Sequence, residues 1–127
     1  MRFLFKKSQR VVRERDFKAV LAHKCSVSSG LMRLYAAPNG LEIPRFGVSV
    51  SRKCGCAVVR NRLKRLAREA FRLHQHDLPP GRDYLLILTA GKPINKDGKA
   101  VKVYFKMYEV RFLEMVNRLS QKPCFKT

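Results

Sequence analysis

The residues best suited to chemistry form one basic segment, Ser51–Arg72, in which eight residues are Lys or Arg and one, Glu69, is an acid. At about 100° per residue, this segment predicts a two-sided helix from about Ala57 to Gln75. One side is apolar and consists of Val59, Leu63, Leu66, Ala67, Ala70 and Leu73. The adjoining arc, about 140° wide, consists of Arg60, Asn61, Lys64, Arg65, Arg68 and Arg72. The remaining cation, Arg62, falls on the opposite flank. Such a face is suited to binding phosphate groups.

A basic helix face is often merely solvated, and this interpretation competes with phosphate binding. Glu69 is the only acid available to neutralise the group, and cations spaced three or four residues apart repel one another unless anions lie between them. Arg also predominates over Lys, which suits bidentate contacts to phosphates and base edges. The pattern therefore favours a nucleic acid over a solvated face.

No set of side chains in the sequence is arranged for catalysis by the protein itself. His23, His74 and His76 are the only histidines, and no carboxylate pair or nucleophile lies near them in the sequence. The nine acids are scattered, whereas protein nucleases need paired acid/base groups or clustered metal ligands. Cys54 and Cys56 form a C-x-C pair without a second ligand pair, which argues against zinc. We therefore expect no catalytic residue and no metal bound by the protein alone.

The cysteines and the chain start bear on the compartment. The four cysteines show no framework spacing and nothing marks secretion, so we expect reduced thiols that fill small sites: Cys25, Cys54, Cys56 and Cys124. The apolar run near Met1 is too short for a signal peptide, and no stretch approaches the ~20 residues of a membrane helix. These features predict a cytoplasmic protein.

Composition limits the class of partner. The 127 residues include 28 Lys or Arg against nine Asp or Glu, a formal net charge of +19. The length predicts one domain, residues 1–127, of which the basic residues 1–10 are expected to be a flexible arm. A hydrophobic content of 46% excludes a wholly disordered basic tail. A polyanion, whether RNA, DNA or an anionic membrane, fits this charge better than a small acidic substrate does.

The elements that must position the basic helix follow from hydrophobic periodicity. Two more helices are expected at about 14–23 and 102–120, the latter with a core-facing stripe of Phe105, Tyr108, Phe112, Met115 and Leu119. Strands are expected at 31–37, 46–51 and 83–89, with turns at 26–30 and 38–40 and a loop at 91–99. A hairpin is the simplest connection between the first two strands. The α-β-β-β-α-β-α order, counting two or three strands before the basic helix, predicts an α+β fold whose small, mostly antiparallel sheet packs with helices.

The basic segment and its flanks resemble the protein subunit of bacterial ribonuclease P. The resemblance is carried by Ser51-Arg52-Lys53, Gly55, Ala57-Val58, Arg60-Asn61-Arg62, Lys64-Arg65 and Arg68-Glu69-Ala70-Phe71. It extends upstream and downstream through Asp16-Phe17, His23, Ser26-Val27, Leu34-Tyr35, Gly81 and Asp83-Tyr84, and covers about residues 8 to 90. Cys56 departs from the Asn that is frequent in the family, and Leu21 from the Phe of some members. The 90–100 loop and the details of the last helix match nothing in the pattern.

This resemblance implies a function and two sets of binding residues. It implies a ribonucleoprotein endonuclease that removes the 5′ leader of precursor tRNA, in which a large RNA with bound Mg²⁺ carries the chemistry. One protein chain, expected to be monomeric, would bind that RNA through Arg52, Lys53, Arg60, Asn61, Arg62, Lys64, Arg65 and Arg68. The leader would lie in a cleft between the first helix and the sheet, on Phe17, Leu21, Arg33, Tyr35 and Ser49. It also implies a left-handed strand–helix–strand crossover, where general statistics predict a right-handed one.

The cleft residues can also be interpreted without the resemblance. Phe17 and Leu21, four apart, share one side of a helix, and Tyr35 alternates with Arg33 on a strand. The small residues of strand 46–51, Gly47, Ser49 and Ser51, would leave room for a single strand beside aromatic rings. The competing interpretation is that Phe17 and Leu21 are plain core contacts.

Two other functional classes agree with composition and charge alone. One is a different RNA-binding structural protein, such as a small ribosomal protein, and the other is a self-sufficient basic nuclease or a DNA-binding protein. Whether the purified chain cleaves precursor tRNA alone, or only with a catalytic RNA, separates these classes.

Overall fold

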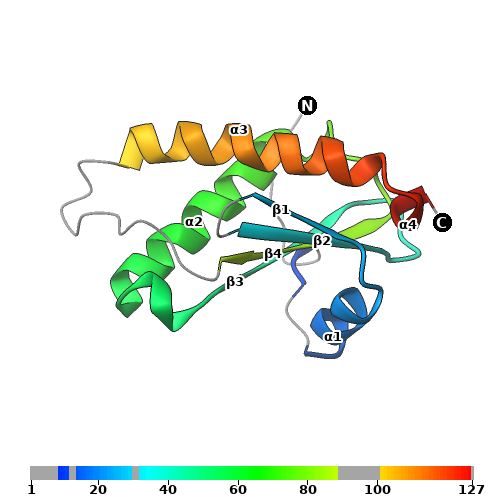
Figure 1. Cartoon of the computed structure of the whole chain (residues 1–127), viewed down its shortest axis with the longest axis horizontal. Coiled ribbons are helices and arrows are strands. Elements are labelled where there is room, and N and C mark those ends of the chain that lie inside the picture. The colour runs from blue at the N-terminus through cyan, green and yellow to red at the C-terminus, as the bar shows by residue number, and fades with distance from the viewer. Residues whose placement is uncertain (1–8, 12–13, 30–31, 89–100, 127) are drawn as a thin grey trace.

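A four-stranded mixed sheet with helices on both faces forms the framework of the computed structural model (Figure 1). The structure describes residues 9–11, 14–29, 32–88 and 101–126, and for 101–107 and 126 only the backbone. In chain order the elements are α1 (Glu14–Ala22), β1 (Ser26–Ser29), β2 (Met32–Pro38), β3 (Arg45–Val50), η2 (Arg52–Cys54), α2 (Ala57–His74), β4 (Arg82–Leu88), α3 (Val101–Ser120) and α4 (Pro123–Lys126). The strand order is β1-β2-β4-β3, antiparallel except for the β3–β4 pair. The predicted α+β class and element order are confirmed.

The helices divide the molecule into three layers. Figure 1 shows α2 and α3 together on one face of the sheet and α1 on the other. The larger core lies under α2 and α3, where Phe46 of β3 stacks on Phe71 of α2 with ring centroids 4.9 Å apart and meets Phe112 of α3 edge-on. A smaller cluster under α1 is built on Val20 and Leu85. The sheet therefore separates α2 from the face that α1 covers.

The helices follow their predicted periodicity closely. The structure places α2 at Ala57–His74 against a predicted 57–75, and buries Val59, Leu63, Leu66, Ala67, Ala70 and Phe71. The sixth core position is thus Phe71 and not the predicted Leu73, which is half-buried. Phe71 takes this position because its large ring fills the space opposite Phe46. The stripe on α3 is buried at Tyr108, Phe112, Met115 and Leu119, and the side chain of Phe105 lies outside the described residues.

The hairpin predicted between strands 31–37 and 46–51 is wrong. These strands correspond to β2 and β3, and β4 lies between them in the sheet. The continuous apolar run of β4 is covered on both faces and so takes a central position, with Tyr84, Leu85 and Leu86 almost fully buried. Helix α2 carries the chain from the end of β3 back to the start of β4, which makes that pair parallel. The hand of this crossover stays a prediction.

Two short elements also differ from the expectation. Residues 26–29, predicted as part of a turn, form edge strand β1, in which Val27 is buried between exposed or half-exposed serines. Its polar composition hides the strand signal because only one side chain faces the core. The C-terminal helix α4 was not predicted at all, and it buries Phe125 against Tyr84. The loop predicted at 91–99 lies outside the described residues.

The prediction that all four cysteines are reduced thiols is wrong for two of them. Cys25 and Cys124, whose Cα atoms lie 5.6 Å apart, form a disulfide across 99 residues of sequence. Cys54 is a buried free thiol that donates to the carbonyl of Leu88, and burial raises its pKa. Cys56 is an exposed thiol that takes no part in the disulfide. The spacing of the cysteines in the sequence does not predict this disulfide, because α4 brings Cys124 to the start of β1 only in the folded chain.

Candidate nucleic-acid interface

The short helix η2 places two cations at the foot of α2. Its N-cap is Ser51, whose hydroxyl accepts a hydrogen bond from the Lys53 amide, so Ser51 belongs to this cap and not to the small-residue face predicted for the strand. Gly55 ends η2 with φ +139°, and a Cβ there would lie 3.1 Å from Val59. This glycine lets the chain break sharply between the two helices. Arg52 and Lys53 are therefore held exposed between the end of β3 and the start of α2.

The predicted cations of α2 lie on the outer side of that helix. Asn61 and Arg65 are exposed, and Arg60, Lys64 and Arg68 are half-buried. None of these four cations forms an ion pair within the described part of the chain. The buried Nε of Arg60 likewise has no hydrogen-bond partner there. Arg62 is half-buried on the flank, as its position on the helix predicts. The positive charge of this face is therefore available to bind an anion from outside the protein.

The one acid of the segment is engaged with the last cation. The Arg72 guanidinium donates two hydrogen bonds to the Glu69 carboxylate, one of them 3.0 Å long, and this pairing lowers the pKa of Glu69. Because Glu69 is occupied at the C-terminal end, it does not neutralise the cations nearer the start of α2. The helix is therefore a cationic face with its single acid turned to an internal partner.

Arg10 is a further cation at this surface that the sequence did not predict. It falls in the expected flexible arm, of which residues 1–8 lie outside the described residues. Arg10 forms a β-bridge with Phe46, and the Gln9 side chain donates to Gln75 over 2.6 Å. Desolvation lowers the pKa of Arg68, and the charge of Arg10 adds to this effect. The two guanidinium groups are thus near each other, brought together by contacts that no local pattern reveals.

The opposite face of the sheet gathers all the residues predicted to bind the leader. The strand registers align Ser28, Arg33, Ile87 and Ser49 in one row across β1, β2, β4 and β3. The neighbouring row consists of Ser26, Tyr35, Leu85 and Gly47. Arg33 and Ser49 are exposed and Tyr35 is half-buried, so the first row is open to solvent while α1 covers part of the second.

The helix α1 forms one wall beside these rows. Phe17, like Tyr35 and Ile87, is half-buried and packs against the small core, whereas Leu21 remains 38% exposed. A Cβ on Gly47 would lie 3.0 Å from Val11 and 3.4 Å from Phe17. The space beside Gly47 is thus filled by the protein's own side chains, contrary to the prediction that it admits a strand of RNA. Only the row through Ser49 remains open.

An ion-pair network closes the other end of this face. Asp83, which is 5% exposed, accepts hydrogen bonds from Arg45 and from the Asn39 amide, the latter over 2.9 Å. Its hydrogen bond with Arg45 raises the pKa of that guanidinium. Asp16 of α1 lies 4.0 Å from the same Arg45. The network fixes the start of β3 and β4 beside α1, and so holds the wall of the open row.

The histidines of the described residues make polar contacts and belong to no cluster of metal ligands. His23 contacts the carbonyl of Cys124, and His74 lies 3.1 Å from a Glu109 oxygen on the next helix. Within the described ranges no three His, Cys, Asp or Glu side chains are grouped as metal ligands. Nor does any described helix have the length and apolar character required to cross a bilayer. What the described surface presents is a cationic helix and an open, partly aromatic sheet face.

Comparison with known proteins places this arrangement in a family. The family model for ribonuclease P matches residues 5–105. The ribonuclease P protein component of Caldanaerobacter subterraneus subsp. tengcongensis is 38% identical over 96 residues, which cover 76% of this chain and 82% of that protein. The solved structure of the RNase P protein from Thermotoga maritima matches with a TM-score of 0.69 at 30% identity, covering 86% of this chain and 96% of the other. The Staphylococcus aureus RNase P protein at 2.0 angstrom matches with a TM-score of 0.66 at 26% identity, covering 87% and 99%.

Proposed function

The chain belongs to the bacterial ribonuclease P protein family, and from that premise we propose that its two surfaces bind two different RNAs. As the protein component of this endoribonuclease, it takes part in processing the 5′ ends of precursor tRNA. The cationic side of α2, together with η2, binds the catalytic RNA through Arg52, Lys53, Arg60, Asn61, Arg62, Lys64, Arg65 and Arg68. The open row on the other face binds the 5′ leader. The chain acts as one domain, residues 1–127, with one copy for each RNA.

The observation that carries this proposal is the separation of the two surfaces by the thickness of the sheet. On this helix Arg60, Lys64, Arg65 and Arg68 form no ion pair with a described residue. Such a face is suited to folded RNA, whose phosphates supply the counter-charge. An exposed row with Arg33 and Ser49, flanked by the half-buried rings of Phe17 and Tyr35, is suited to a single strand, whose bases can stack. Arg52 and Lys53 stand at the end of β3, between the two surfaces.

In this mechanism the protein's residues bind and orient, and the RNA subunit performs the chemistry. Mg²⁺, when bound, supplies the activation of water and the stabilisation of the leaving oxygen during hydrolysis of the phosphodiester. The described side chains include no donor set for it, so we assign it mainly to the RNA subunit. By fixing the leader on the sheet and the RNA on α2, the protein holds the scissile bond next to the catalytic RNA, which lowers the entropic cost of reaching the reactive geometry.

Photo-crosslinking tests the placement of the leader. Precursor tRNA with a photoreactive nucleotide in its leader is bound to the reconstituted enzyme, and the crosslinked peptides are identified by mass spectrometry. We expect crosslinks to α1, β2 and β3, centred on Phe17, Tyr35 and Ser49. Crosslinks confined to α2 would contradict the assignment of the sheet face. A photoreactive nucleotide in the body of the tRNA serves as the control and should not label these strands.

A further inference from the structure

The free edge of β1 is covered by two cations from the end of the chain. Among the described residues β1 pairs only with β2, and the Cys25 carbonyl accepts from the Ala36 amide on the paired side. Because carbonyls alternate along a strand, those of Ser26 and Ser28 point to the free side. There the Lys122 ammonium donates to the Ser26 carbonyl over 2.6 Å, and the Arg118 guanidinium donates to the Ser28 carbonyl over 3.0 Å.

These two side chains and Arg33 form what we term the β1-edge patch: Arg33, Arg118 and Lys122. Arg33 donates to the Ser26 hydroxyl over 3.1 Å, so all three converge on the same short strand. All three are exposed, and within the described ranges none of them has an ion-pair partner. Their acceptors are neutral, so the hydrogen bonds fix the positions of the cations and leave their charges intact. The acid nearest in sequence is Glu114, one turn before Arg118.

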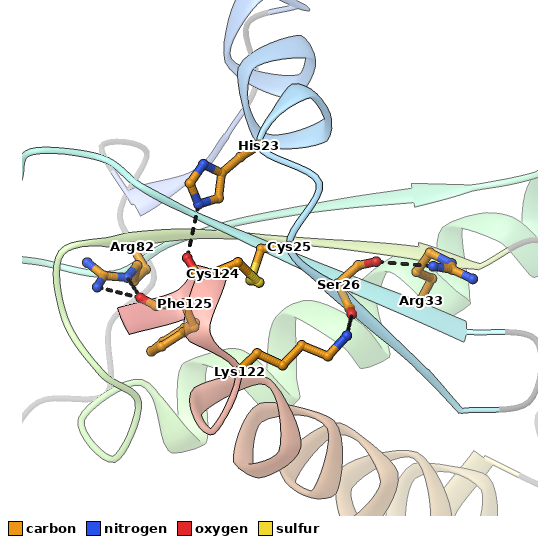
Figure 2. The surroundings of a disulfide bond; sticks show 8 residues. All are labelled: His23, Cys25, Ser26, Arg33, Arg82, Lys122, Cys124 and Phe125. Carbon is orange, nitrogen blue, oxygen red and sulfur yellow. Dashed lines mark hydrogen bonds between the residues drawn. A yellow bond between two sulfur atoms is a disulfide. The ribbon is translucent and has the colours of Figure 1, made fainter. Parts of the chain in front are cut away.

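A covalent bond anchors the C-terminal part of the patch to the start of β1, on the side of the larger core. Figure 2 shows the Cys25–Cys124 disulfide next to Lys122 and Ser26, with Arg33 on the same strand pair. Beside it, the His23 ring contacts the Cys124 carbonyl over 3.2 Å, and Arg82 donates to the Phe125 carbonyl over 2.8 Å. The last turn of the chain is therefore fixed at the start of β1, and with it Lys122. A mobile tail would not hold a cation at this edge.

The open row leads directly to this patch. From Ser49 the row runs through Ile87 and Arg33 to Ser28, crossing three strand spacings or about 14 Å before it reaches the β1 edge. The catalytic RNA, bound by α2 and η2, lies at the β3 end of the row. The cleavage site must be near that RNA, so the leader enters the row at β3 and its 5′ portion leaves at β1.

We propose that the β1-edge patch binds the phosphates of the leader segment that lies 5′ of the part held on the sheet. This inference rests on the proposed function, because it extends the same leader past the open row. It assigns a role to Arg118 and Lys122, which stand outside both predicted sets of binding residues. Longer leaders should consequently gain affinity from contacts that a leader ending on the sheet cannot make.

The test compares two precursor tRNAs in the reconstituted enzyme, one with a leader that ends on the sheet and one whose leader extends several nucleotides further. The double variant Arg118→Ala/Lys122→Ala should bind the long-leader precursor more weakly. For this precursor, the slope of log affinity against log salt concentration should be shallower by about 1.4 units, because two single-strand phosphate contacts are lost. The short-leader precursor should bind as to the unaltered protein. The matched control is Arg15→Ala/Lys18→Ala, which removes two exposed cations of α1 and should not separate the two substrates.

The outcomes distinguish this inference from the function on which it rests. Equal weakening for both leaders would overturn it, because the cations would then contact the catalytic RNA or the tRNA body. Unchanged binding of both leaders would overturn it as well. In either case the proposed leader cleft stands if Tyr35→Ala weakens the binding of precursor tRNA but not of mature tRNA. The thermal midpoint of the double variant is measured in parallel, and the single variant Lys122→Gln repeats the test with the stem of the side chain retained.

Discussion

Tyr35 is the residue at which the cleft assignment is most directly tested. Its ring is half-buried between the small core under α1 and the open row, beside Arg33. Loss of one base–aromatic stack costs roughly 1–3 kcal/mol, about five- to a hundred-fold in affinity. Tyr35→Ala should therefore weaken binding of precursor tRNA to the assembled enzyme by about that range, as measured by equilibrium binding. Mature tRNA, which has no leader, should bind almost as before.

The control for this prediction is Tyr35→Phe, which keeps the ring and removes only the hydroxyl. It should retain most of the affinity for precursor tRNA if stacking is the main contribution. Because a half-buried ring also contributes to the core, the thermal midpoint of each variant is followed. Equal loss of affinity for precursor and mature tRNA, or unfolding of the protein, would show that Tyr35 is a core residue.

Asp83 is the residue whose loss should most disturb the wall of the cleft. Its carboxylate is almost fully buried and accepts from Arg45 and Asn39. Asp83→Ala leaves the Arg45 cation without its main partner, and removal of one member of a buried pair costs about 3–5 kcal/mol. The free energy of unfolding, measured in urea, should fall toward that range. Asp16→Ala, which removes a more exposed carboxylate 4.0 Å from Arg45, should cost only up to about 1 kcal/mol.

At the scale of elements, α2 determines affinity for the catalytic RNA. With about six phosphate contacts, the log–log dependence of affinity on salt should have a slope of about −4 to −5. Changing Arg65 and Arg68 together to Ala should make this slope shallower by one to two units, roughly one for each lost contact. Filter binding over a range of salt concentrations measures it. Arg15→Ala/Lys18→Ala, on the helix across the sheet, should leave the slope unchanged; an unchanged slope in the α2 variant would show that this helix faces solvent.

The link between α4 and β1 should contribute measurable stability. Closing a loop of about 100 residues in the unfolded chain is worth about 4–5 kcal/mol in the chain-entropy model, and removal of a native disulfide commonly costs 2–5. Reduction of the Cys25–Cys124 bond should therefore lower the free energy of unfolding by an amount in that range. Thermal denaturation with and without a dithiol reductant checks this. The Cys124→Ser variant should match the reduced protein and should not respond to reductant.

At the scale of the whole molecule, a formal charge of +19 accompanies a set of described residues that contains no cluster of metal ligands. The protein alone should leave precursor tRNA intact even with Mg²⁺, because its described residues include no cluster of metal ligands and the side chains of the His74–Glu109 pair, which joins α2 to α3, are mostly buried. Addition of a bacterial ribonuclease P RNA should yield mature 5′ ends on a gel. Cleavage by protein freed of all RNA would contradict the assignment of the chemistry to the RNA subunit.

Local patterns in the sequence were enough for α1, α2 and α3 and for the basic face of α2. The basic face of α2, its boundaries to within one residue and the stripe on α3 follow from a period of 3.6 residues, which depends only on neighbours in sequence. The same is true of β4, whose apolar run marks a strand covered on both faces. The candidate residues Phe17, Tyr35 and Ser49 were selected through the resemblance to the ribonuclease P protein, and periodicity alone places each of them only on one face of its own element.

Only the tertiary structure decided how these elements meet. The central place of β4, the existence of β1 and the Cys25–Cys124 bond all join segments far apart in the sequence. The approach of Arg10 to Arg68 and the filling of the space beside Gly47 by Val11 are of the same kind. Periodicity cannot reveal such contacts, because the free energy that selects them comes from packing between elements and not from the preferences of one segment. The β1-edge patch exists for this reason alone: α3 and α4 bring its two C-terminal cations to a strand that the sequence did not show.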